Sequence, residues 1–194
     1  MNSATNVNFV NADVDATIGL QGDGLSKYLN TDDVMNSIIT DNYNWQIGHF
    51  IIGGIPTLTF LIRPMGYYRS TGTRGAAYLQ IDTSKRPSAF GNWSTISVGT
   101  SGSLTTNSSH FGAKFSASEL ILMHDGVKKS TNTTIDTDVL IDLPMTMFAF
   151  PINGTYQSFS LLNHSGYFLA TGMTEADLTA FNTSYKTFIN NITA

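Results

Sequence analysis

The carboxylates are the first residues of this chain that could carry catalysis. Glycoside hydrolysis with retention needs two carboxyl groups about 5–5.5 Å apart, one as nucleophile and one as acid. The chain has only two glutamates, Glu119 and Glu175, and they lie far apart in the sequence. Asp136 and Asp138 stand two apart, with Asp142 beyond them, in a Thr-rich stretch that is typical of a loop. We interpret that stretch as a solvated loop or a cation contact, and we expect no enzyme.

Metal-ligand patterns are weak along the whole chain. Calcium binds Asp and Asn oxygens, and the comparable clusters are Asp23, flanked by two glycines, and the adjacent Asp32 and Asp33. A tight turn explains the first and the solubility of a loop explains the second. Four histidines are far apart and lack metal-ligand spacing, so they are interpreted as ordinary strand or turn residues: His49, His110, His124 and His164. No metal site and no cofactor is expected.

Aromatic side chains supply the candidate ligand-binding residues. An exposed ring can stack on the face of a sugar, and Asn, Asp or Arg nearby can bond its hydroxyls. Tyr67, Tyr68 and Arg69 offer that combination, as does the stretch of Phe90, Gly91, Asn92 and Trp93. Adjacent residues of a strand point to opposite faces, so at least one of the two tyrosines should lie outside the core. The alternative, that these rings cover a sheet face or pack on a neighbouring subunit, stays open.

The elements that must position these residues are mostly strands. Short runs of β-branched and aromatic residues are separated by Gly, Asn, Asp and Ser, as in β-sandwiches. Asp125–Gly126 accepts the positive φ values of a type I′ turn and predicts a hairpin, and Asn153–Gly154 predicts a second turn. The expected strands are 6–10, 26–30, 45–52, 57–63, 76–81, 93–98, 109–115, 119–124, 127–129, 146–150, 159–161 and 167–170.

One helix is expected near the C-terminus, at about residues 174–190. Thr174 is a good N-cap, and Asp177 stands three residues on, as in a weak capping box. The apolar face that should dock on the sandwich has spacings of three, four and three: Leu178, Phe181, Tyr185 and Phe188.

Composition limits the number of domains and the kinds of partner. A chain of 194 residues suits one domain, with residues 1–12 as a candidate N-terminal arm and 13–194 as the sandwich with its helix. Charged residues make up 12%, about half the usual share. The net charge is −4, and the ten Lys and Arg are scattered, so no nucleic acid partner is expected. No apolar stretch is long enough for membrane insertion, and the absence of cysteine excludes disulfides.

Three stretches, in this order, resemble the concanavalin A-like lectin/glucanase domains found in phage virion proteins. The first is 19–31, with Gly-Asp-Gly and then Lys-Tyr-Leu, which resembles the segment that introduces the family's first long strand. The second is the strand and His-Asp-Gly-Val turn of 115–130. The third is 148–154, followed by 169–178 and the closing helix. Residues 55–104 match poorly, so no binding surface there is inferred by analogy.

This resemblance implies an all-β, concanavalin A-like jelly-roll sandwich of two antiparallel sheets with one C-terminal amphipathic helix. It also implies a place on a virus particle, but no single activity, because the fold hosts several. We therefore expect a phage virion surface protein that attaches to host-surface or environmental glycans. Its expected partners are other virion proteins and further copies of itself, as a homo-oligomer or as multiple copies on the particle. The alternative is a structural capsid or tail component that uses the fold as a docking block, with no ligand of its own.

Overall fold

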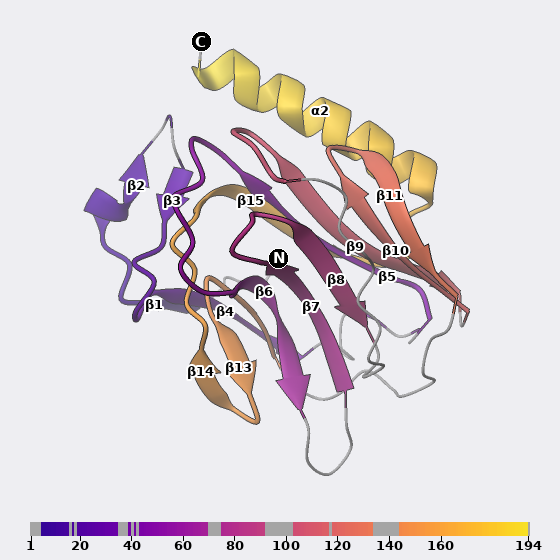
Figure 1. Ribbon diagram of the computed structural model, residues 1–194, viewed down its shortest axis with the longest axis horizontal. Coiled ribbons are helices and arrows are strands. Elements are labelled where there is room, and N and C mark those ends of the chain that lie inside the picture. The colour runs from indigo at the N-terminus through magenta and orange to yellow at the C-terminus, as the bar shows by residue number, and fades with distance from the viewer. Residues whose placement is uncertain are drawn as a thin grey trace.

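The computed structural model describes residues 5–15, 17, 19–34, 39, 41, 43–69, 75–91, 103–116, 118–133 and 144–193. Within these ranges the chain forms two β-sheets that face one another, and a C-terminal helix lies along the outer side of one of them (Figure 1). The predicted architecture of two sheets and one C-terminal α-helix is confirmed.

The sheet called A here has eight strands. Its hydrogen-bonded order is β1-β4-β12-β6-β13-β14, and β7 joins β6 to β8. Its pairs are antiparallel except where β13 meets β6, since Ile152 pairs with Tyr68 in parallel. Two antiparallel sheets were predicted, so this pair is a local exception. The strands are β1 (Thr5–Val7), β4 (Tyr28–Val34), β6 (Ile62–Arg69), β7 (Gly75–Ile81), β8 (Pro87–Gly91), β12 (Pro144–Met147), β13 (Phe150–Ile152) and β14 (Thr155–Gln157).

The second sheet, sheet B, has seven strands in the order β11-β10-β9-β5-β15-β3-β2. All of its pairs are antiparallel. The Asp125–Gly126 turn joins β10 to β11, as its sequence predicts. The strands are β2 (Val14–Asp15), β3 (Gly19–Gln21), β5 (Trp45–Ile51), β9 (Ser109–Ser116), β10 (Glu119–His124), β11 (Val127–Asn132) and β15 (Asn163–Ala170).

The main core lies between the two sheets because alternate residues of each strand point inward. On β5, Trp45 and Ile47 enter this core, while Phe50 points to the opposite side of sheet B. Burial of each such side chain stabilises the fold by roughly 1.5–3 kcal/mol. The core residues contributed by the long strands are Trp45, Ile47, Met65, Tyr67, Ala77, Leu79, Ala89, Leu120, Leu122, Met145 and Met147.

Helix α2 (Glu175–Thr193) covers the outer face of sheet B (Figure 1). The reciprocal capping box is present, because Asp177 N–H donates to Thr174 Oγ1 at 3.2 Å and Thr174 N–H donates to Asp177 Oδ2 at 2.8 Å. Leu178 is fully buried, and the ring of Tyr185 stacks on Phe50 with centroids 3.8 Å apart. No helix in the described ranges has the length and hydropathy that crossing a bilayer requires.

One predicted contact of this helix is wrong. Phe188 is 56% exposed, whereas Asn182 and Ile189 are buried against the sheet. At 3.6 residues per turn, position 188 lies about 80° around the helix from Leu178, while position 189 lies only about 20° away. With a spacing of three, four and three, Phe188 therefore lies away from the side of the helix that contacts sheet B.

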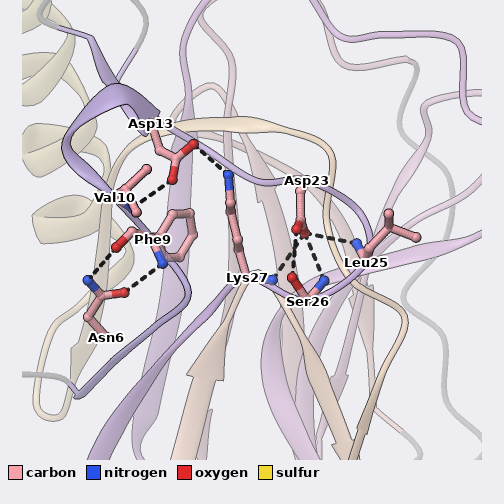
Figure 2. A network of polar contacts seen from close by, with 8 residues as sticks. All are labelled: Asn6, Phe9, Val10, Asp13, Asp23, Leu25, Ser26 and Lys27. Carbon is pink, nitrogen blue, oxygen red and sulfur yellow. Dashed lines mark hydrogen bonds and ion pairs between the residues drawn. The ribbon is translucent and has the colours of Figure 1, made fainter.

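The N-terminal residues pack on the sandwich as far as they are described. In the predicted arm 1–12, residues 1–4 lie outside the described ranges, and Thr5–Val7 pairs with β4. Phe9 is buried, with its ring centroid 4.9 Å from that of Phe148. Figure 2 shows how Asn6 holds this turn through two hydrogen bonds with the Phe9 backbone. Lys27 Nζ lies 2.5 Å from Asp13 Oδ1 and ties the segment to the rest of the chain. The domain boundary at residue 13 stays a prediction.

Candidate functional site

An aromatic cluster occupies the outer face of sheet A. The alternation of β6, β7 and β8 sends Tyr67, Leu79 and Ala89 into the core and their neighbours to the opposite side. These neighbours, together with β13 and an arginine that precedes Pro64, form the group called the aromatic face here: Tyr68, Tyr78, Phe90, Phe150 and Arg63.

The rings of the aromatic face contact one another closely. Tyr78 stacks on Phe90 with centroids 4.4 Å apart and meets Phe150 edge-on at 4.8 Å. Tyr68 flanks the group, 6.0 Å from Phe150. Tyr78 and Phe150 are buried, whereas Tyr68 and Phe90 are partly exposed. The cluster therefore has a packed centre and two accessible rings at its margin.

Arg63 places a planar cation against this centre. Its guanidinium carbon lies 4.7 Å from the ring centroid of Phe150 and 5.4 Å from that of Tyr78. Nη1 donates to Ser158 Oγ at 3.3 Å, while Nε is buried with no hydrogen-bond partner among the described residues. Burial raises the pKa of Tyr78, and the charge of Arg63 opposes that shift. A guanidinium held in this way presents fixed N–H donors beside apolar ring faces.

The predicted ligand-binding residues are only partly brought together. Tyr67 is fully buried between the sheets and Tyr68 is on the outer face, so the prediction that one of the two lies outside the core is confirmed. Because Tyr67 has no exposed surface, we remove it from the candidate ligand-binding residues. Arg69 is partly exposed at the end of β6. Asn92 and Trp93 lie outside the described residues, so their assignment stays a prediction.

The two glutamates, far apart in sequence, approach the same lysine. Lys128 Nζ lies 2.7 Å from Glu175 Oε2 and 3.9 Å from Glu119 Oε1. The hydrogen bond to Glu175 raises the pKa of Lys128. These are partly exposed ion pairs between β10, β11 and α2, far from the aromatic face in the sheet order. Residues 136, 138 and 142 lie outside the described ranges.

Asp23 has its carboxylate fully engaged in a turn (Figure 2). Its Oδ1 accepts the backbone N–H groups of Leu25, Ser26 and Lys27 at 2.8–3.0 Å, and its Oδ2 accepts the Ser26 hydroxyl at 2.8 Å. Burial raises the pKa of Asp23, but these hydrogen bonds outweigh it and hold the pKa below its usual range. The interpretation as a tight turn is confirmed.

The other acidic cluster was misplaced by the sequence analysis. Asp32 and Asp33 were predicted in a loop, but the backbone places them in β4. That strand extends further than expected because its far end pairs with β12, where Val34 lies opposite Pro144. The side chains of these two residues lie outside the described set.

The four histidines gather in one row across sheet B, which the sequence analysis missed. They come from four neighbouring strands, β15, β5, β9 and β10, and all are buried. Direct cross-strand pairing places His49 opposite His110 and His110 opposite His124. The only advance signal was that His49, His110 and His124 fall within expected strands, while His164 lies between two of them. Among the described residues, no group of three or more potential ligands has the geometry to hold a metal ion.

A hollow of about 250 Å³ lies between α2 and the end of sheet B, at Asn107, Tyr185 and Lys186. The Tyr185 hydroxyl donates to the Ser165 carbonyl, and Lys186 Nζ lies 2.6 Å from Asp125 Oδ1. The aromatic and charged groups of this hollow therefore attach the helix, which makes it a weaker candidate than the aromatic face.

Comparisons with known proteins place the fold. No protein-family model matches the chain, and no curated protein matches it in sequence. The chain is similar to a Trypanosoma rangeli sialidase, with a TM-score of 0.63 and 10% identity over 95% of this chain and 31% of that one. It is also similar to a heptameric SAP-like pentraxin of Limulus polyphemus, with a TM-score of 0.52 and 6% identity over 72% and 70%. A sialidase of Streptococcus pneumoniae is similar too, with a TM-score of 0.55 and 9% identity over 75% of this chain and 24% of that one.

These likenesses show the fold alone, and they confirm the concanavalin A-like jelly roll. The chain spans less than a third of the length of the sialidases it matches. Nothing in the comparisons supports a phage origin. The expectation that the chain is no enzyme is contradicted, because solved structures of similar fold include sialidases, which are enzymes.

Proposed function

We propose that this chain is a carbohydrate-binding domain whose ligand lies on the aromatic face of sheet A. The observation that carries the proposal is the combination of two partly exposed rings, Tyr68 and Phe90, with Arg63 held beside the buried rings between them. The concanavalin A-like fold shared with sialidase and pentraxin structures supports it.

The chemistry of this face suits a sugar. One face of a pyranose ring presents C–H groups, which pack on an aromatic ring. The hydroxyls of the sugar need hydrogen-bond donors beside that aromatic ring. Aromatic contacts of this kind contribute about 0.5–1.5 kcal/mol beyond the burial of area. Arg63 offers planar N–H donors that fit hydroxyl or carboxylate oxygens. Because the site offers only a small number of such contacts, we expect each domain to bind its sugar weakly.

We propose further that the domain is displayed on a phage particle, beside other virion proteins and in several copies, to attach it to glycans of the host surface. The sequence resemblance of 19–31, 115–130 and 148–178 supports this setting. Multiple copies would offset a weak single site, since linked sites raise the overall avidity by about 10²–10⁴.

The test is glycan binding by saturation-transfer NMR and titration against a panel of polysaccharides. Tyr68→Ala should lower the affinity by about two- to tenfold, the equivalent of one aromatic contact. Tyr167→Ala is the matched control, because Tyr167 is 44% exposed on β15 of the other sheet and should leave binding unchanged. Equal affinities of the two variants, or no glycan bound by the unaltered chain, would refute the proposal. Reducing-sugar release, measured on the same panel, reports whether binding is accompanied by cleavage.

A further inference from the structure

Three of the four histidines are joined by direct contacts between their rings. His49 Nδ1 lies 3.2 Å from His164 Nδ1, and His49 Nε2 lies 3.2 Å from His110 Nδ1. The exposed fractions of these side chains' residues are 1%, 7% and 0%, in the order His49, His164 and His110. We call these three rings the histidine row. His124 continues the line on β10, opposite His110.

The contacts of the row can form with every ring neutral. Ser160 Oγ lies 3.4 Å from His164 Nε2 and accepts the Leu162 N–H at 3.1 Å. When Ser160 donates to His164 Nε2, His164 donates through Nδ1 to His49, and His49 donates through Nε2 to His110. In the reverse order every donor and acceptor exchanges places. In both orders each ring that links two neighbours uses one nitrogen as donor and the other as acceptor, which is the neutral imidazole.

Burial disfavours a first charge on the row, and a charge on two neighbouring rings does not fit the contacts. A protonated imidazole donates from both nitrogens, so two charged neighbours would bring N–H against N–H across a 3.2 Å contact. Burial holds the pKa of His49 well below its ordinary value, and the charges of His164 and His110 lower it further. Burial also lowers the pKa of His110 and that of His164 to about 3 in each case.

No described carboxylate compensates a charge on the row. The ring of Phe148 packs on His164 with centroids 4.4 Å apart, and the backbone of Ser88 lies beside His110. Asp125, in the β10–β11 turn, lies 3.3 Å from His124, which is not one of the three rings of the row. Its other oxygen is already bonded to Lys186 Nζ at 2.6 Å and to Ser109 N–H at 2.9 Å.

We propose that the histidine row is an acid-sensitive lock, which holds this end of the sandwich closed only while its rings are neutral and opens it on acidification. The row lies on the face of sheet B that meets Phe148 and Ser160. When the row opens, residues 160–162 therefore separate from the sheet. Nearby, the β10–β11 turn is tied to α2 through Asp125 and Lys186, and Ser109 is tied to Asn182. The release therefore extends to the contact that attaches the helix.

The direction of the pH effect follows from where the protons bind. Unfolded histidine titrates near pH 6.5, and the folded row binds protons only at much lower pH. Between these limits the unfolded state holds more protons, so stability is complete above about pH 6.5 and falls as the pH drops toward about 3.

Urea unfolding of the whole chain between pH 7.5 and 4.5 tests the lock, because its slope against pH counts the protons taken up. Near pH 5.5 about three protons should be bound on unfolding, one for each ring of the row. His164→Asn keeps an amide near the position of Nδ1 but cannot titrate, and it should lower the uptake by about one. Ser160→Ala is the matched control, since it removes the hydroxyl partner and no titrating group. An uptake near zero in the unaltered chain, or the same uptake in His164→Asn, would overturn the proposal.

Two measurements on the folded chain complete the test and do not depend on any variant. Imidazole ¹⁵N shifts at pH 5.5 should show three neutral rings, and a native ring of the row with an ordinary midpoint would refute the lock. Hydrogen-exchange protection should fall on acidification first at the His49 and His164 ends of β5 and β15, before the β6–β7 pair. An equal loss in both sheets would show global unfolding without local release.

Discussion

At the scale of single residues, the Gly-Asp-Gly motif is explained by the neighbouring segment 160–162, which leads into β15. A Cβ on Gly22 would lie 2.0 Å from the Ser160 carbonyl oxygen, and Gly24 has a φ of +71°. Their N–H groups donate to the carbonyls of Leu162 and Ser160, each at 3.2 Å. The turn was predictable from the three residues alone. Its partner was not, because 160–162 lies far along the chain and has no motif that points back.

Asp23→Ala tests the turn. Three backbone N–H groups and one hydroxyl lose their common acceptor, so the free energy of unfolding should fall by about 1–3 kcal/mol at pH 7. Because the folded pKa of Asp23 lies below the unfolded value, this contribution is present above about pH 4 and is lost as the pH falls further. Urea unfolding at pH 7 and at a pH below about 4 measures the contribution of Asp23 to the free energy of unfolding. Asp23→Asn keeps an acceptor oxygen and should lose less; equal losses would contradict the hydrogen-bonded turn.

The candidate ligand-binding residues were predictable only where they are adjacent in sequence. Tyr68 was identified because it follows Tyr67, although the expected strand ended at residue 63. Tyr78 and Phe150 were missed, since each is an ordinary strand residue until the register brings it to the same face. The histidine row was missed for the same reason: pairing of β5 with β9, and not spacing along the chain, sets His49 opposite His110.

At the scale of elements, local pattern predicted the existence of strands better than their limits. The expected strand 57–63 is wrong, because β6 begins at Ile62, and Ile55 and Leu58 instead join a separate apolar cluster with Leu104. The expected strand 146–150 is divided at Phe148, whose φ of +67° turns the chain between β12 and β13. Both errors come from long-range packing, which no window of sequence contains.

Helix α2 offers a direct test of the corrected docking face. Leu178→Ala should lower the free energy of unfolding by about 2–5 kcal/mol, because its side chain is wholly buried. Phe188→Ala should cost less than about 1 kcal/mol, because more than half of the residue is exposed. Chemical unfolding of the two variants gives both values. A large loss in Phe188→Ala would mean that the original face, with Phe188 inward, is the correct one.

At the scale of the whole molecule, the proposed binding should depend on how many copies act together. A single domain with one weak aromatic site should dissociate quickly, whereas copies fixed densely on a surface should bind the same glycan about 10²–10⁴ times more tightly. Biosensor measurements at graded surface densities test this. The Tyr68→Ala variant should bind more weakly at every density, and an affinity that is independent of density would exclude cooperation between copies.

The position of the late strands has a consequence for how the chain is made. β12 lies between β4 and β6, and β15 lies between β5 and β3, so the last segments to be synthesised fill the middle of both sheets. Until they leave the ribosome, the earlier strands have unpaired edges, which are prone to join other chains. Closure then requires contacts between distant parts of the chain, and folds of that kind form in about milliseconds to seconds. A chain interrupted after residue 143 would therefore be two incomplete sheets rather than a smaller domain.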